Sequence, residues 1–81
     1  MHPNSLTDFN ADAHFERGVT YLKLGNYRQA ISDFERAIEI NPDYAVAYHD
    51  RSVVYGILGD RRHEIKDLQK AQSLGSKNVN K

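Results

Sequence analysis

The chain repeats itself at an interval of 34 residues, and this period limits its possible folds more than any other feature. When residues 11–44 are laid over residues 45–78, eleven positions carry the same residue in both copies. They are Ala11/Ala45, Ala13/Ala47, Arg17/Arg51, Val19/Val53, Tyr21/Tyr55, Leu24/Leu58, Gly25/Gly59, Arg28/Arg62, Ile31/Ile65, Asp33/Asp67 and Ala37/Ala71. This period is typical of a helix–turn–helix unit that buries its apolar face against its neighbour. We therefore expect two stacked copies of one helical hairpin.

Apolar spacing and helix-breaking residues predict four helices, over residues 12–24, 27–40, 44 or 45 to 58, and 61–74. The first helix can be capped by Asn10 or Asp12, and the third by Asp43. Glycine or asparagine favours the left-handed backbone that ends a helix, so Gly25-Asn26 and Gly59-Asp60 predict the two hairpin turns. Short turns of this kind make consecutive helices antiparallel neighbours.

The ends of the second and fourth helices are predicted from different signals. Asn41-Pro42 should end the second helix, because proline disfavours helical backbone in the residue before it. Gly75 should end the fourth, which leaves residues 76–81 as a polar, mobile tail. In this fourth helix we expect Ile65, Leu68 and Ala71 to face inward. The predicted organisation is a polar leader (residues 1–10), repeat 1 (11–44), repeat 2 (45–78) and a tail (79–81).

Composition limits the classes of function. Eleven basic and eleven acidic residues give no net charge, so the basic footprint of a nucleic-acid-binding protein is missing. No apolar run approaches the roughly 20 residues that span a bilayer, and the N-terminus has no signal-peptide pattern. The chain has no cysteine. We expect a cytoplasmic protein without membrane insertion or nucleic-acid binding.

The balanced charge hides an asymmetry between the repeats. Residues 11–44 hold four basic and six acidic residues, a net charge of −2, whereas residues 45–78 hold six basic and four acidic ones, a net charge of +2. Two interpretations stay open. The difference can reflect chance on solvated faces, or the opposite ends attract each other and favour antiparallel or head-to-tail self-association.

The residues at fixed positions of each copy resemble the tetratricopeptide repeat family. The first copy supplies Gly18, Tyr21, Gly25, Tyr27, Ala30, Phe34, Ala37 and Pro42. The second supplies Tyr48, Ser52, Tyr55, Gly59, Leu68 and Ala71. His14 stands where the family usually has tryptophan or tyrosine. The resemblance implies an all-α fold, in which four antiparallel helices form a right-handed superhelical stack of two repeats.

The second copy departs from the family pattern at Arg61, Glu64, Gln72 and Ser76. All four departures make the last helix more polar, as expected of a final helix that faces water. Glu64 stands where a small side chain would touch Ser52, so we expect its stem to lie in the helix–helix groove. The alternative is that the chain is a fragment of a longer array whose faces pack on further repeats.

In this family the first helix of each repeat lines a concave face that binds ligands. Position by position, the face implied here comprises Asp12, Phe15, Glu16, Val19, Leu22 and Lys23 from repeat 1, with Val46, His49, Asp50, Val53, Gly56 and Ile57 from repeat 2. Its apolar part comprises Phe15, Val19, Leu22, Val46, Val53 and Ile57. We expect these six side chains to be exposed, and the alternative is that some of them cover each other or Phe9. The resemblance therefore implies a scaffold that binds a protein, a peptide or another copy of the chain.

Catalysis and metal binding have little support in the sequence. The four histidines, His2, His14, His49 and His63, lack the i, i+4 spacing with an intervening glutamate that marks a helical zinc site. Ser32 and Ser52 have no predicted histidine or aspartate partner for nucleophilic catalysis. We expect no enzymatic activity and no cofactor. A structural or adaptor fragment of a longer solenoid is the first alternative, and a metal-binding or enzymatic protein is a remote one.

Overall fold

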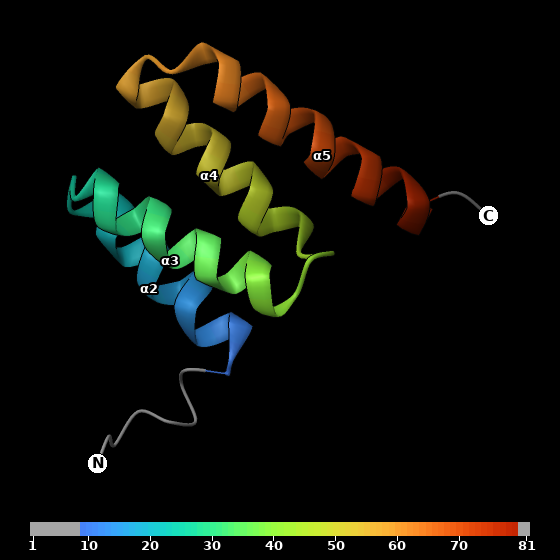
Figure 1. Ribbon diagram of the computed structural model, residues 1–81, viewed down its shortest axis with the longest axis horizontal. Coiled ribbons are helices and arrows are strands. Elements are labelled where there is room, and N and C mark those ends of the chain that lie inside the picture. The colour runs from blue at the N-terminus through green and yellow to red at the C-terminus, as the bar shows by residue number, and fades with distance from the viewer. Residues whose placement is uncertain (1–8, 80–81) are drawn as a thin grey trace.

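The computed structural model of the chain describes residues 9–79, with the backbone alone for residues 76–79. Its helices are α2 (Ala11–Lys23), α3 (Tyr27–Ile40), α4 (Ala45–Leu58) and α5 (Arg61–Val79). α2 pairs with α3 and α4 with α5, and α4 packs on α3 to join the two hairpins (Figure 1). The predicted all-α stack of two hairpins is confirmed. Residues 1–8 of the predicted leader and residues 80–81 of the predicted tail lie outside the described residues.

The helix starts are set by different capping groups. Asn10 caps α2, because its side-chain oxygen accepts a hydrogen bond of 3.1 Å from the Ala13 amide. The prediction that Asp43 caps α4 is wrong. Tyr44 is the N-cap residue, and Asp43 stays in the turn, where its amide donates to the Asn41 side chain at 3.2 Å.

The two hairpin turns rest on glycines in a left-handed conformation. Gly25 has a φ of 79° and Gly59 a φ of 82°. Side chains other than glycine are strained there, so these residues end the first helix of each hairpin as predicted. The chain then reverses within a few residues and the second helix begins at Tyr27 or Arg61.

The prediction that Gly75 ends the last helix is wrong. α5 continues through Gly75 to Val79, so residues 76–79 are helical instead of forming a tail. In repeat 1 the residue after Asn41 is Pro42, which forces the backbone out of the helix. Ser76 stands at the corresponding position in repeat 2 and imposes no such restriction. A glycine inside a helix costs only about 1 kcal/mol, so it does not end α5 by itself.

The core lies where α4 meets the first hairpin. Ala30, Phe34 and Val54 are fully buried and form one cluster. Gly18 leaves room for Phe34, because a methyl group added at Gly18 would lie 2.7 Å from the Cε1 atom of that ring. The predicted close approach of α2 and α3 at this glycine follows from this packing.

The expected burial of the last helix is only partly right. Ile65 is 43% exposed, whereas its counterpart Ile31 packs against the core. Ile31 lies on the side of repeat 1 that α4 covers, and within the described residues repeat 2 has no following hairpin over Ile65. Leu68 and Ala71 are half-buried. Asp67 is buried instead, with 4% of its surface exposed.

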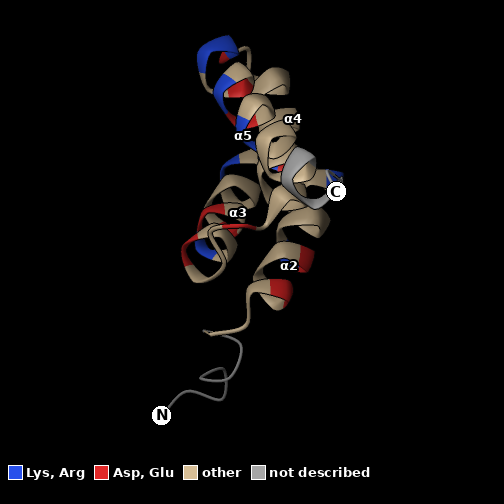
Figure 2. Ribbon diagram, turned by 90° about the vertical axis from the view of Figure 1, so that its right-hand side faces the viewer, with Lys and Arg blue, Asp and Glu red and all other residues tan. Residues whose placement is uncertain are grey.

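The charges are distributed unevenly over the two hairpins (Figure 2). Basic residues gather on α5, which also carries Glu64 and Asp67, and acidic residues lie on α2 and α3. No helix in the described part of the chain is both long and apolar enough to cross a membrane.

Candidate partner-binding face

The apolar residues of the predicted face differ between the two repeats. In repeat 1, Phe15, Val19 and Leu22 are half-buried and pack against the core cluster. The Phe15 ring lies 5.7 Å from the ring of Phe34 and 5.2 Å from the ring of Tyr44. The expectation that all six apolar side chains are exposed is therefore wrong for these three, since each contributes to internal packing.

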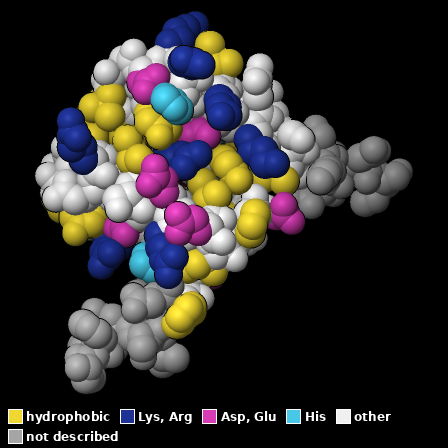
Figure 3. All heavy atoms as spheres, in the orientation of Figure 1, with side chains coloured by type: hydrophobic (Ala, Val, Ile, Leu, Met, Phe, Trp, Pro, Cys, Tyr) yellow, Lys and Arg dark blue, Asp and Glu magenta, His cyan; other side chains and the backbone are white. Residues whose placement is uncertain are grey.

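The three apolar residues of the predicted face on α4 are open to solvent. Val46, Val53 and Ile57 are 45%, 39% and 51% exposed. Their spacing of seven and four residues places them on one face of the helix. We call Val46, His49, Val53 and Ile57 the α4 stripe. On the face of the molecule that Figure 3 draws, apolar side chains lie among charged side chains of both signs.

The polar residues of the predicted face form local contacts. Asp12 accepts a hydrogen bond from the Tyr44 hydroxyl. Burial first, and then the hydrogen bond to Asp12 and the negative charge of that carboxylate, raise the pKa of Tyr44 to about 12. His49 and Asp50 lie 3.1 Å apart through Nδ1 and Oδ1. The side chains of Glu16 and Lys23 are exposed at the edge of the face.

Glu64 covers part of the face at Gly56. Its Oε2 atom lies 2.8 Å from the position that a Cβ atom at Gly56 would take. From the sequence, Glu64 stands where a small side chain would touch Ser52, and its stem is expected to lie in the helix–helix groove. The half-buried stem reaches one helical turn farther along α4, so the carboxylate occupies the space beside a glycine that has no side chain.

A hollow of about 470 Å³ opens between α4 and α5, beside the stripe. It is lined by Ala45, Val46, His49, Leu68, Ala71 and Gln72. We call it the end pocket. Sequence reasoning missed it, although Leu68 and Ala71 are family positions expected to face inward. The signal that could have revealed it is that Val46 and His49 stand one period after Asp12 and Phe15, on the helix that pairs with the one carrying Leu68 and Ala71.

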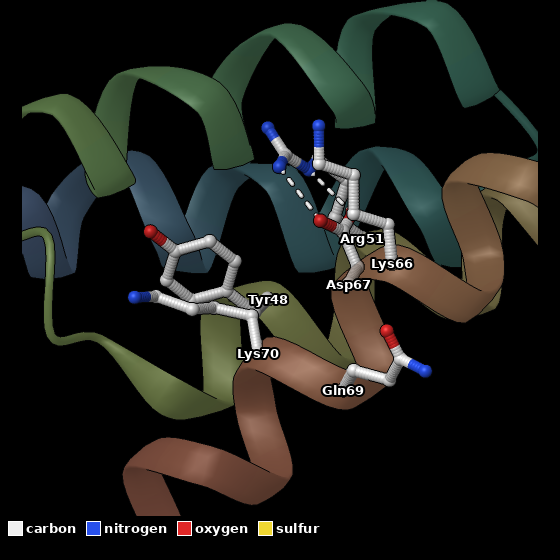
Figure 4. Close-up of a pocket in the computed structure, with 6 residues that line it drawn as sticks. All are labelled: Tyr48, Arg51, Lys66, Asp67, Gln69 and Lys70. Atoms are coloured by element: carbon white, nitrogen blue, oxygen red, sulfur yellow. Dashed lines mark hydrogen bonds and ion pairs between the residues drawn. The ribbon is translucent and has the colours of Figure 1, made fainter.

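A second hollow, of about 460 Å³, is lined by Tyr48, Arg51, Lys66, Asp67, Gln69 and Lys70 (Figure 4). Its centre is an ion pair, in which Arg51 donates two hydrogen bonds to the buried Asp67 carboxylate, at 2.7 and 2.8 Å. The hydrogen bonds to Asp67 raise the pKa of Arg51, against the opposing effect of its burial. Sequence reasoning missed this pair, although both residues belong to the eleven identical positions.

Among the described residues, no group of three or more histidine, cysteine, aspartate or glutamate side chains is arranged to hold a metal ion. His14 is buried at the packing position that the sequence predicted, and its Nδ1 atom lies 3.6 Å from Oδ1 of Asp33. His63 lies at the start of α5, where its amide and ring both contact Asp60. These contacts lower the pKa of Asp60, first through the amide hydrogen bond and then through the ring.

Stacked hairpins with a 34-residue period, small residues at the helix contacts and an open apolar face define a helical-repeat interaction scaffold. Residues 11–44 match the sequence model of the tetratricopeptide repeat family. Residues 11–44 are therefore recognised as a tetratricopeptide repeat, and α4 with α5 form a second helical hairpin with the same 34-residue spacing.

Solved structures of MamA, a protein that contains tetratricopeptide repeats, are similar to the chain. One crystal structure matches with a TM-score of 0.90 at 28% identity, over 96% of this chain and 46% of that chain. Another crystal structure matches with a TM-score of 0.83 at 26% identity, and the match covers 96% of this chain and 44% of that chain. A third structure, described as MamA MSR-1 C2, matches with a TM-score of 0.87 over 94% of this chain and 44% of that chain. At 21% identity this match supports the fold alone. The chain spans less than half the length of these structures, and a search of curated protein sequences finds no match.

Proposed function

We propose that the chain is a non-catalytic protein-interaction module that binds an apolar peptide, a helix or a second copy of itself through its concave face. The observation that carries this proposal is the α4 stripe. It presents Val46, Val53 and Ile57 on one helix face, each between 39% and 51% exposed. An apolar row with polar borders suits the apolar side of a partner helix or peptide.

The residues of repeat 1 have a supporting role in this proposal. Three apolar residues of α2 pack against the core and so hold this helix in place beside the α4 stripe: Phe15, Val19 and Leu22. Glu16 and Lys23 stand exposed at its border. A partner would gain apolar contact from α4 and orientation from these charges, because charges at the rim of an interface mainly set register and encounter rate.

The experiment compares two substitutions on the same helix. Peptides are first selected from a random library against the wild-type chain, and the affinity of a selected peptide is then measured by fluorescence anisotropy. Val53→Asp should weaken binding at least about tenfold, which corresponds to about 1.4 kcal/mol, because it places a charge in the stripe. Leu58→Asp is the matched control, since Leu58 is 50% exposed on α4 but lies outside the stripe.

Unchanged affinity and oligomeric state in Val53→Asp would contradict this assignment. Equal losses in Val53→Asp and Leu58→Asp would instead indicate a general effect of charge on α4. Circular dichroism of both variants checks that each retains its helices. Because both side chains are exposed, neither substitution should unfold the protein.

A second candidate function is a structural part of a longer repeat array. It is supported by the MamA structures, of which the chain covers 44–46%. In that case the exposed residues of α4 and α5 would pack on a neighbouring repeat. The mass of the protein in its natural source, measured after denaturation, distinguishes the two cases. A mass near 9.3 kDa would contradict the longer array.

A further inference from the structure

The end pocket lies in repeat 2 and corresponds to a site in repeat 1 that is already occupied by a side chain. Moving its lining residues back by one period of 34 residues identifies the corresponding site. The counterparts of Ala45, Val46, His49, Leu68, Ala71 and Gln72 are Ala11, Asp12, Phe15, Phe34, Ala37 and Ile38. The two sets come from equivalent helices, α4 with α5 and α2 with α3.

In repeat 1 this site holds the aromatic ring of Tyr44. The ring lies 5.2 Å from that of Phe15, which in turn lies 5.7 Å from the ring of Phe34. The Tyr44 hydroxyl donates a hydrogen bond to Asp12. Tyr44 is the N-cap residue of α4, so the site receives the aromatic residue that stands at the start of the next hairpin.

In repeat 2 the described backbone brings no such residue to the pocket. Repeat 1 leaves α3 at Ile40 and turns back through Asn41–Asp43, which places Tyr44 over the first hairpin. α5 instead stays helical to Val79 and makes no equivalent turn. The apolar surface of Leu68 and Ala71 therefore remains half-open.

The lining of the end pocket indicates which aromatic residue it suits. Val46 replaces Asp12, so the carboxylate that accepts the tyrosine hydroxyl is missing. A buried hydroxyl without a partner is unfavourable, which makes phenylalanine a better occupant than tyrosine. The chain presents Phe9, which is 76% exposed. It directly precedes Asn10, the N-cap of α2, and so lies within one residue of the position that Tyr44 holds before α4.

We propose that the end pocket receives Phe9 of a second copy of the chain, so that copies stack head to tail. In this arrangement α2 of one copy lies on α4 and α5 of its partner, much as α4 lies on α2 and α3 within the chain. The charges support the same orientation. Repeat 1, which Phe9 directly precedes, has a net charge of −2, and repeat 2, which forms the pocket, has +2, with most of its basic residues on α5 (Figure 2).

This contact goes beyond the proposed function and is separable from it. It uses Val46 and His49 of the α4 stripe, but Val53 and Ile57 lie outside the pocket. The contact is heterologous, because one copy contributes α2 and the other contributes α4 and α5. Contacts of this type leave a free site at each end of the assembly and allow further copies to add.

The first experiment is the mass of the 9.3 kDa chain by light scattering, over a range of concentrations and at low and high salt. The wild-type mass should rise with concentration and stay raised in high salt, since the contact is mainly apolar. Phe9→Ser and Ala71→Glu should each weaken association at least about tenfold. Leu24→Ser is the matched control, because Leu24 is 68% exposed at the opposite end of α2.

Mixing the two variants tests the head-to-tail geometry directly. Phe9→Ser keeps an intact pocket and Ala71→Glu keeps an intact Phe9, so an equimolar mixture should form a one-to-one dimer and grow no further. An interface that uses the same patch on both copies would not be restored by mixing. Gln72→Arg, at an exposed position of the pocket rim, replaces Ala71→Glu if circular dichroism shows that the latter loses helix.

Three results would overturn the proposal. They are a wild-type chain that is monomeric at every concentration, association that survives Phe9→Ser, and a variant mixture that stays monomeric. A monomeric chain that binds a synthetic peptide of residues 41–58, the segment that contains Tyr44 and α4, would assign the pocket to a helix of another protein instead. Unchanged peptide affinity in Val53→Asp, with head-to-tail stacking intact, would contradict the proposed function alone.

Discussion

Arg51 holds the buried carboxylate of Asp67 through two hydrogen bonds, of 2.7 Å from Nε and 2.8 Å from a terminal nitrogen. Arg17 holds Asp33 in the same way one repeat earlier, at 2.8 and 2.9 Å. The environments of the two arginines differ. The Arg51 side chain is 18% exposed and lies near Glu35 of α3, whereas the Arg17 side chain is 57% exposed. The second pair is therefore more strongly desolvated by the stack.

The Arg51–Asp67 pair should show strong energetic coupling. Asp67→Leu alone should destabilise the fold by about 3 kcal/mol, because it leaves Arg51 without its carboxylate in a poorly solvated place. The double variant Arg51→Met with Asp67→Leu should recover most of this loss, since two apolar side chains of similar volume need no partner. Urea unfolding of both single variants and the double variant gives the coupling energy. Equal stability of Asp67→Leu and the double variant would contradict this account.

Gly18 should not tolerate a side chain. In Gly18→Ala the new methyl group would lie 2.7 Å from the Phe34 ring, so α2 and α3 must separate or the ring must move. Overpacking of this kind costs about 1–3 kcal/mol, more than the gain of about 1 kcal/mol from a better helix former. We expect a net loss in the free energy of unfolding, measured by urea denaturation.

Gly75→Ala is the matched control for Gly18→Ala. Gly75 also lies within a helix, but an added Cβ atom meets nothing within 4 Å. This substitution should stabilise the protein by about 0.5–1 kcal/mol through backbone entropy alone. A shift of the unfolding midpoint in the same direction in both alanine variants would contradict the prediction that only Gly18 lacks room for a side chain.

Sequence could predict the elements of this fold because each depends on local chemistry. Gly25 and Gly59 mark turns that require a positive φ, and Asn10 supplies a hydrogen bond that a helix start needs. The end of the last helix could not be predicted from Gly75 alone. Whether Gly75 ends a helix depends on the residue that follows it, and Ser76 lacks the restriction that Pro42 imposes.

The candidate site was harder to predict because it depends on contacts between helices. Val19 and Val53 occupy the same position in their repeats, yet Val19 packs against the core cluster, whereas Val53 is 39% exposed and no hairpin within the described residues follows over it. The pairing of Arg51 with Asp67 joins residues 16 apart in sequence across an antiparallel hairpin. The period identifies both as recurring residues, but only the packed hairpin shows that they contact each other.

Tyr44 should make stability fall in alkaline solution. Its pKa is raised to about 12 in the folded chain, against an ordinary value of 10.0, so the folded state holds the hydroxyl proton more tightly than the unfolded state does. This contribution is fully present below about pH 10 and is lost as the pH rises toward about 12. Linkage sets an upper bound of about 2.7 kcal/mol, and we expect about 1 kcal/mol because the hydrogen bond to Asp12 is exposed to solvent.

Urea unfolding of the wild type and Tyr44→Phe at about pH 9 and about pH 11.5 isolates this group, because Tyr44→Phe keeps every other titrating residue. The wild type should lose more stability than the variant over this interval, and equal losses would show that the Tyr44 proton does not contribute to folding.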